Sequence, residues 1–395
     1  MLRHFLDGAF GNRHLNYLFI HLGLVNFGQI LRLQISGVFF LERGFSLAAV
    51  CFIMGALIGL RFLLRTPLVL IPHWFGCKPA LVIGQFILAL GFVCFAVSEQ
   101  RSSLLWVGLV LMSAGEALYW HAYHTVFATL AEHGKFGRQL SGRTMFMNAG
   151  ALCAPLATAL LHQTGSWNLI YLLSAMALLL SLLPLLFLPE PCPARPLDIR
   201  TGLKVDKAGM KLFAGWGASS AVMAVIWPMA IFLQLGTVEK FSWMLAVTII
   251  LSTFMTMFVA RRIDLGHGLA VVAWGALAYA ASVIALAVLG RTPLSIAVIT
   301  AVMTLCSYSY THPFIASLYR WAKETQDPLW FHYWSEFGWD LGNLVVLWSA
   351  SLILYLQSDL SLRWAMLLIL PTLLWSYLVY KTDGRLFSRA GKATS

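Results

Sequence analysis

The chain has 395 residues, of which 59% are hydrophobic and only 11% carry a charge, and its formal net charge is +11. Soluble globular chains carry roughly 25% charged residues, so most of this surface is expected to face a medium other than water. Uncharged runs long enough to cross a bilayer recur along the chain. Because about 20 apolar residues span the hydrocarbon core as a helix, the composition excludes a soluble domain and predicts an all-α polytopic membrane protein.

Twelve spanning helices are predicted, with one long polar break between the sixth and the seventh. In chain order they cover residues 16–40, 46–72, 79–98, 102–130, 140–162, 167–188, 210–236, 241–261, 268–290, 293–321, 329–356 and 361–380. Residues 189–209 are rich in proline and charge, which indicates a linker. The predicted domains are an N-terminal six-helix bundle (1–188), a cytoplasmic linker (189–209) and a C-terminal six-helix bundle with a short basic tail (210–395).

The distribution of Lys and Arg predicts the orientation of these helices. If both termini are cytoplasmic, the cytoplasmic segments hold 19 of the 27 basic residues, the outer loops hold 5 and the spans hold 3. Basic residues accumulate in cytoplasmic loops. We therefore expect a multi-pass protein of the plasma or inner membrane with both termini in the cytoplasm. The net positive charge is then explained by the orientation of the helices and by contact with anionic lipid, and not by nucleic-acid binding.

Motifs for covalent chemistry, metals and cofactors are not found. The six cysteines are scattered without a CxxC pair, so free thiols are expected. The sequence contains neither a HExxH element nor a GxxxxGK[ST] element, so an enzyme or an ATP-driven pump is not expected. No cofactor and no metal are predicted.

The two halves of the chain carry related segments. Residues Tyr123–Leu130 read YHTVFATL and residues Thr311–Leu318 read THPFIASL, at an offset of 188. Gly76 and Gly266 lie in the loops after the second and the eighth helix, at an offset of 190. Repeated halves are common in secondary transporters, in which the substrate site lies near the midplane between the repeats.

The 6+6 arrangement, the basic central linker and the short loops resemble the major facilitator superfamily over the whole chain, as a divergent member. The loop segment VLIPHWFGCK keeps only Gly76 and Lys78 of that family's GxxxDRxGRR signature. The segment GALCAPLATA, with Pro155, is similar to the family's antiporter signature, although small residues at a helix crossing explain it equally well. Gly76, Lys78, Pro155 and Arg143 are the candidate gating residues. The resemblance implies a central cavity lined by the first, fourth, seventh and tenth helices.

Charged and polar side chains inside the first two spans are candidates for substrate binding, because a charge within the bilayer is costly. Asn26, Gln29 and Arg32 are spaced three apart and so share one helix face. Arg61 lies one turn before Arg65. Each arginine binds either an anionic group of the solute or a structural carboxylate, and Arg32 can alternatively snorkel to the interface.

The fourth span carries a stripe that contains Glu116, Trp120 and Tyr123, with His124 beside it. A desolvated glutamate takes up a proton more readily, which favours proton coupling at Glu116, and His124 is assigned to the same role because an imidazole can titrate. The alternative for Glu116 is a permanent ion pair with an arginine, and for His124 a hydrogen-bonded packing role. Trp120 and Tyr123 are candidate substrate contacts.

Three later spans supply the remaining candidates. Tyr308, Tyr310 and His312 precede Pro313, so this stretch is either a cavity wall or an ordinary proline kink. Glu336 and Asp340 are one turn apart, and their repulsion favours a proton on one of them. Trp227, Tyr308 and Tyr310 are assigned to substrate binding, and His312, Glu336 and Asp340 to proton coupling; packing and gating are the alternatives.

These features predict a secondary active transporter that moves a small organic solute by alternating access, with proton coupling and with an anionic solute favoured by the arginines. The expected partners are that solute, protons and membrane lipids, and a monomer is expected. Two alternatives remain open at this stage. One is a membrane sensor or assembly protein of transporter ancestry that does not transport, and the other is a membrane-embedded enzyme.

Overall fold

The structure is a computed structural model of the chain. It describes residues 7–98, 102–132, 134–163, 167–264, 267–357 and 362–382, except for the side chains of residues 32–35, 256, 257, 260, 261, 263 and 264. Arg32, one of the predicted substrate-binding residues, therefore lies outside the described side chains.

Twelve helices in the described residues are long and apolar enough to cross a membrane, which confirms the predicted fold class. Their ends lie within four residues of the predicted ones. The spans are formed by α2 (Arg13–Glu42), α3 (Leu47–Leu68) with α4 (Leu70–Phe75), α5 (Cys77–Val97), α6 (Ser103–Leu130), α7 (Phe136–His162), α8 (Trp167–Leu180) with α9 (Leu182–Leu185), α11 (Ala208–Ala221) with the π-helix η1 (Val222–Ile226) and α12 (Trp227–Leu235), α13 (Val238–Asp264), α14 (Gly268–Leu289), α15 (Pro293–Glu324), α16 (Pro328–Leu356), and α17 (Leu362–Ala365) with the 3-10 helix η2 (Met366–Leu368) and α18 (Ile369–Thr382).

Local sequence signals explain where several helices begin. The side chain of Asn12 accepts hydrogen bonds from the first backbone N–H groups of α2, and Asp327 does the same for α16. Thr292 and Ser295 form a reciprocal capping box at the start of α15. Such side chains satisfy N–H groups that have no partner within the helix. Gly76 separates α4 from α5 with a φ of +92°, a conformation that favours glycine.

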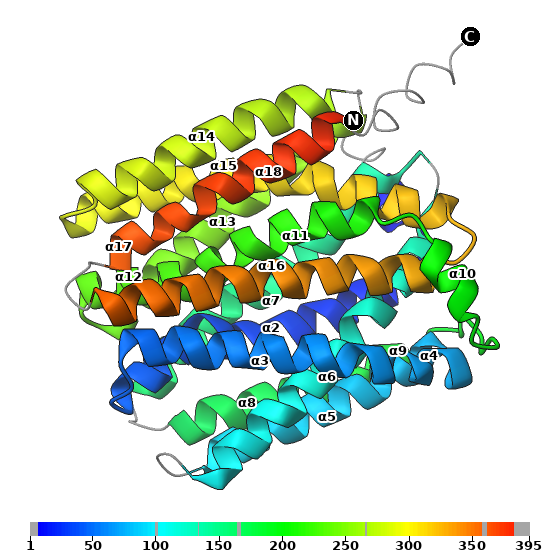
Figure 1. The fold of residues 1–395 in the computed structure, drawn as a ribbon, viewed down its shortest axis with the longest axis horizontal. Coiled ribbons are helices and arrows are strands. Elements are labelled where there is room, and N and C mark those ends of the chain that lie inside the picture. The colour runs from blue at the N-terminus through cyan, green and yellow to red at the C-terminus, as the bar shows by residue number, and fades with distance from the viewer. Residues whose placement is uncertain are drawn as a thin grey trace.

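The helices form two groups that lie against each other (Figure 1). Helices α2 to α9 pack mainly with one another, as do α11 to α18. The groups meet where α3 lies along α16 and where α7 lies along α13. The short helix α10 (Ile199–Lys204), the start of α2 and the end of α18 share one end of the bundle, at the right of Figure 1. We call this the linker end; the domain boundaries and the cytoplasmic location of this end stay predictions.

Within each group, two helices touch backbone to backbone through glycine. A Cβ atom on Gly150 of α7 would lie 2.0 Å from the carbonyl oxygen of Gly23 on α2. A Cβ atom on Gly342 of α16 would lie 2.0 Å from the carbonyl oxygen of Ala214 on α11. Close approach through small residues is typical of membrane helix pairs. Gly150 begins the segment that contains Pro155, so this helix crossing accounts for the glycine at the head of that segment.

Candidate functional site

A cavity of about 340 Å³ lies between the two groups of helices. Seven helices contribute to its wall: α2, α3, α6 and α7 from one group, and α11, α15 and α16 from the other. The lining residues are Asn26, Gln29, Arg61, Trp120, His124, Arg143, Thr144, Met147, Asn148, Trp216, Ser220, Tyr308, Thr311, His312, Ile315, Glu336 and Trp339. Nine of the predicted substrate, proton or gating residues are brought together here.

A network of buried ion pairs forms one wall of this cavity and joins α3 to α6 and α16. Arg61 donates from Nη1 to Glu116 at 2.9 Å and from Nε to Asp340 at 2.6 Å. Arg65 donates from Nε to the other oxygen of Asp340 at 2.8 Å and contacts Glu336 at 3.4 Å. All five side chains are buried. Each of these two arginines therefore has a carboxylate partner, which offsets the cost of a charge within the bilayer.

His124 continues the network toward the centre of the molecule. Its Nε2 lies 3.2 Å from Oε1 of Glu336, and its Nδ1 lies 2.6 Å from the hydroxyl of Tyr319. The imidazole is stacked between Trp120 and His332, with ring centroids 5.7 Å and 5.5 Å away. His124 thus bridges α6 to α16 through a group that can carry a proton.

Arg143 of α7 is a second cationic group in the cavity, and it is only 5% exposed. Its Nε donates to the hydroxyl of Tyr123 at 3.1 Å, and its guanidinium lies 5.4 Å from the centre of that ring. No carboxylate among the described side chains lies within ion-pair distance of Arg143. A buried charge without a counter-ion is costly. Arg143 is therefore placed to attract an anion that enters the cavity.

Polar side chains surround Arg143. Thr144 accepts or donates a hydrogen bond with Nε2 of His312 at 3.3 Å. Tyr308 donates from its hydroxyl to Oδ1 of Asn148 at 3.4 Å. Asn26 donates to the carbonyl oxygen of Met147 at 3.1 Å. These contacts link α2, α7 and α15 around the cavity.

Three of the predicted substrate-binding residues lie outside the lining of this cavity. Tyr123 accepts the hydrogen bond from Arg143 but does not itself line the cavity. Tyr310 is fully buried and packs against Tyr279 and Phe314, so the structure places it in the core of its helix group and not at the cavity. Trp227 lines a neighbouring chamber, described below.

The predicted gating residues Gly76 and Lys78 contact the linker. Lys78 donates from Nζ to the carbonyl oxygen of Leu188 at 2.7 Å, and its backbone N–H donates to Glu190 at 2.9 Å. A Cβ atom on Gly76 would lie 2.7 Å from the same carboxylate. Glu190, which the sequence reasoning missed, thus caps the start of α5, where an anion is favoured. Pro155 is buried in α7 and is not among the cavity residues.

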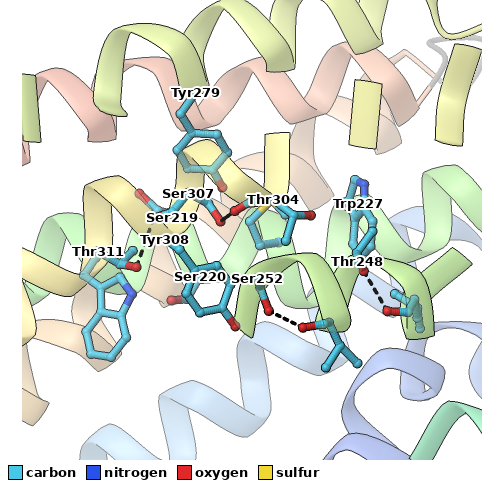
Figure 2. Close-up of a pocket in the computed structure, with 14 residues that line it drawn as sticks. Ser219, Ser220, Trp227, Thr248, Ser252, Tyr279, Thr304, Ser307, Tyr308 and Thr311 are labelled. Carbon is cyan, nitrogen blue, oxygen red and sulfur yellow. Dashed lines mark hydrogen bonds between the residues drawn. The ribbon is translucent and has the colours of Figure 1, made fainter. Parts of the chain in front are cut away.

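A second chamber, of about 220 Å³, adjoins the cavity (Figure 2). It is enclosed by α11, η1, α12, α13, α14 and α15. The two spaces share Trp216, Ser220, Tyr308 and Thr311 as lining residues. Sequence reasoning singled out Tyr308 and Trp227 of this chamber, but not the serines and threonines of α11 and α13, because a serine or threonine in a helix carries no charge that must be explained. The signal that was available is the run of Thr304, Ser307 and Thr311 along one face of α15.

Comparison with known proteins shows which family the chain is similar to. A model of the Major Facilitator Superfamily matches residues 42–217. The fold is similar to the human organic anion transporter MFSD10 (TETRAN), with a TM-score of 0.69 and 14% identity over 93% of this chain and 98% of that one. Residues 42–217, a little under half of the chain, are thus similar to the major facilitator superfamily. A POT family transporter in complex with 5-aminolevulinic acid is also similar, with a TM-score of 0.70 and 12% identity over 95% of this chain and 97% of that one.

Curated relatives match parts of this chain. Dipeptide and tripeptide permease A of Proteus mirabilis (strain HI4320) is 30% identical over 111 residues, which are 27% of this chain and 22% of the permease. Multidrug resistance protein MdtH of the same organism is 26% identical over 227 residues, 53% of this chain and 55% of that protein. The chain thus matches from about a fifth to about half of the length of these relatives. Together with the twelve spans, these matches indicate a multi-pass membrane protein.

Proposed function

We propose that this protein is a secondary transporter that carries a small organic anion across the membrane together with a proton, by alternating access. The observation that carries the proposal is the cavity between the two helix groups, into which the buried Arg143 brings a positive charge without a described counter-ion. A site at the junction of two helix groups can be exposed to either side by rocking of one group against the other.

The charge of the cavity favours an anionic solute. Among the described side chains, the guanidiniums of Arg61 and Arg65 are engaged by the three carboxylates of the network. Arg143 instead has a phenol as its partner. A carboxylate or phosphate group of the solute would supply the missing negative charge, and a planar guanidinium binds such groups with two parallel hydrogen bonds. The similar organic anion transporter and the bound 5-aminolevulinic acid are in keeping with this solute class.

The same charges couple the anion to a proton. Among the described side chains, Arg61, Arg65 and Arg143 are matched in number by the carboxylates of Glu116, Glu336 and Asp340, and only Arg143 has no ion-pair partner. A bound anion adds one negative charge, which a proton shared by His124 and Glu336 would neutralise. Anion binding and proton binding therefore strengthen each other, and linkage requires the effect to be reciprocal. We expect the affinity for the anion to rise as the pH falls.

The proposed orientation in the membrane follows from the distribution of basic residues in the sequence. The linker end carries the basic segments and is placed in the cytoplasm. The helix groups 1–188 and 210–395 are proposed as the two rocking domains, and the protein is proposed to act as a monomer. The direction of net transport then follows the anion and proton gradients.

The test uses the purified full-length protein and 5-aminolevulinic acid and hexanoate as probes, with hexanamide as the uncharged analogue. We expect both acids to bind more tightly at pH 6 than at pH 8, by up to about tenfold per pH unit for one linked proton. Arg143→Gln is expected to abolish binding of both acids. Arg138→Gln, on the same helix but outside the cavity lining, serves as the matched control.

Two results would contradict the proposal. If hexanamide binds as tightly as hexanoate, the cavity does not select for an anion. If Glu336→Gln, which cannot ionise, retains the wild-type dependence of affinity on pH, Glu336 and His124 do not hold the coupled proton. Uptake of labelled 5-aminolevulinic acid into proteoliposomes with an imposed pH gradient then separates a transporter from a sensor that only binds.

A further inference from the structure

We infer that the chamber beside the cavity is a subsite for an uncharged, polyhydroxylated part of the solute, so that the anion carried is a hydroxylated organic acid of the sugar-acid type. This inference rests on the proposed function, because Arg143 would hold the acidic end of the same molecule. Trp216, Ser220, Tyr308 and Thr311 border both spaces, so one solute can reach from one into the other.

The lining of the chamber differs in kind from that of the cavity. Nine of its fourteen lining residues carry a hydroxyl group, and none of these described residues carries a charge. Figure 2 shows these side chains converging on one space from α11, α13, α14 and α15. Small-molecule sites are mostly apolar with a few placed polar groups, so a wall of hydroxyls is specific for a polar, uncharged occupant.

Most of these hydroxyls face the chamber as hydrogen-bond acceptors. Thr304, Ser307 and Thr311 each donate their own proton to a carbonyl oxygen of α15, at 2.8 to 3.0 Å. Thr248 and Ser252 do the same on α13, at 2.8 Å and 2.7 Å. A hydroxyl whose proton is engaged still offers lone pairs. A solute bound in the chamber must therefore supply several hydrogen-bond donors.

One group in the wall requires an acceptor instead. The indole Nε1–H of Trp227 is buried, and it has no hydrogen-bond partner among the described residues. A buried donor without a partner costs free energy that a ligand can recover. An ammonium group donates but does not accept, whereas a hydroxyl does both. The combination of acceptors with one unpartnered donor therefore favours hydroxyl groups over an amine.

The backbone at this point is adapted to form the chamber. The π-helix Val222–Ile226 interrupts the seventh span between Ser219 and Trp227, which both line the chamber. Single π-helical turns inside α-helices are frequent at functional sites, because the extra residue turns the following side chains to a new direction. The flat indole and phenol rings of Trp216 and Tyr279 provide apolar surface against which the C–H groups of a sugar-like chain can pack.

The test compares acids that share one six-carbon chain length: hexanoate, 6-hydroxyhexanoate, 6-aminohexanoate and gluconate, titrated into the purified protein. We expect gluconate to bind at least tenfold more tightly than hexanoate, with 6-hydroxyhexanoate in between. Ser307→Ala should weaken gluconate binding about threefold to tenfold, as expected for one hydrogen bond, and leave hexanoate unchanged. Trp227→Phe should act in the same selective way.

Ser309→Ala is the matched control. Ser309 also donates to a carbonyl oxygen of α15, but it borders a different pocket. The inference is overturned if gluconate and hexanoate bind equally, if 6-aminohexanoate binds best, or if Ser307→Ala and Ser309→Ala have the same effect. If all acids bind equally and still require Arg143, the subsite alone fails and the proposed function stands. If no acid binds, both fail.

Discussion

The two ends of the contact between α3 and α16 are held by different forces. At the linker end, Arg61 and Arg65 of α3 bind Asp340 of α16, and the hydroxyls of Thr66 and Tyr333 lie 3.0 Å apart. At the opposite end, no described side chain of this contact is charged. There, Phe52 stacks on Trp348 at 6.0 Å, and the same indole lies directly against Gly55.

This difference suggests how the two ends can open separately. Ion pairs respond to protonation and to an anion that competes for an arginine, whereas close packing of apolar groups does not depend on charge. The linker end is thus sensitive to the chemistry of the cavity, which it adjoins at Arg61 and Glu336. The opposite end provides a constant, charge-independent closure. In the proposed alternating-access cycle the two ends must not open together, and contacts of different kinds allow one end to open while the other stays closed.

The largest effect is expected from Asp340→Ala. Asp340 accepts from both arginines, so its loss removes a charged acceptor from each guanidinium and leaves Arg61 with Glu116 alone and Arg65 with Glu336 alone. Removing one partner of a buried ion pair typically costs about 3–5 kcal/mol. We expect a clearly lower melting temperature of the purified protein, followed by tryptophan fluorescence. Asp340→Asn, which keeps the size and one acceptor oxygen, should fall between this variant and the wild type; an unchanged melting temperature for Asp340→Ala would show that the ions do not hold this end.

A smaller effect is expected at the packed end from Gly55→Ala. The new Cβ would lie 2.4 Å from Cδ1 of Trp348, too close for two carbon atoms that are not bonded to each other. Overpacking of this kind costs about 1–3 kcal/mol. Gly59→Ala is the matched control, because its Cβ would lie 3.5 Å from the nearest atom of Leu344, an ordinary contact. That variant should be neutral or stabilising, since alanine favours a helix over glycine by about 1 kcal/mol.

Varying the pH distinguishes the packed end of the α3–α16 contact from the linker end. The change in melting temperature for Gly55→Ala should be the same at pH 6 and pH 8, and Trp348→Ala in the same chain should relieve it. If the decrease in melting temperature for Gly55→Ala depends on pH, or if Gly59→Ala lowers the melting temperature by the same amount, packing alone does not close this end.

The sequence was sufficient to predict the helices and to show that the buried charges need oppositely charged partners. It was not sufficient to predict which residues those partners are. Apolar runs and basic loops define twelve spans because membrane thickness and charge placement act on each segment alone. The one-turn spacing of Arg61 and Arg65, and of Glu336 and Asp340, showed that each pair needs opposite charge. That these two pairs meet depends on how α3 lies against α16, which no local pattern specifies.

The sequence was least informative where residues are uncharged or lie in the linker. The serines and threonines of the chamber satisfy their hydroxyls within their own helices, so their positions left no local conflict to detect. Glu190 lies in a polar linker, where a single carboxylate is unremarkable until the fold brings it to Gly76 and Lys78. Tyr310 was selected for its polar neighbours in the sequence, although its side of α15 faces the core.

The smallest effect is expected from Ser351→Ala, which tests whether hydrogen bonding contributes to the packed end. Ser351 of α16 donates to the carbonyl oxygen of Ala48 at the start of α3, at 2.8 Å. One such bond is worth about 0.5–1.5 kcal/mol, less than the overpacking at Gly55. Thr66→Val removes the comparable hydroxyl contact at the linker end. If packing dominates at one end and ions at the other, both variants should lower the melting temperature slightly and equally; a larger loss for Ser351→Ala would mean that this hydrogen bond, and not the indole of Trp348, holds the packed end closed.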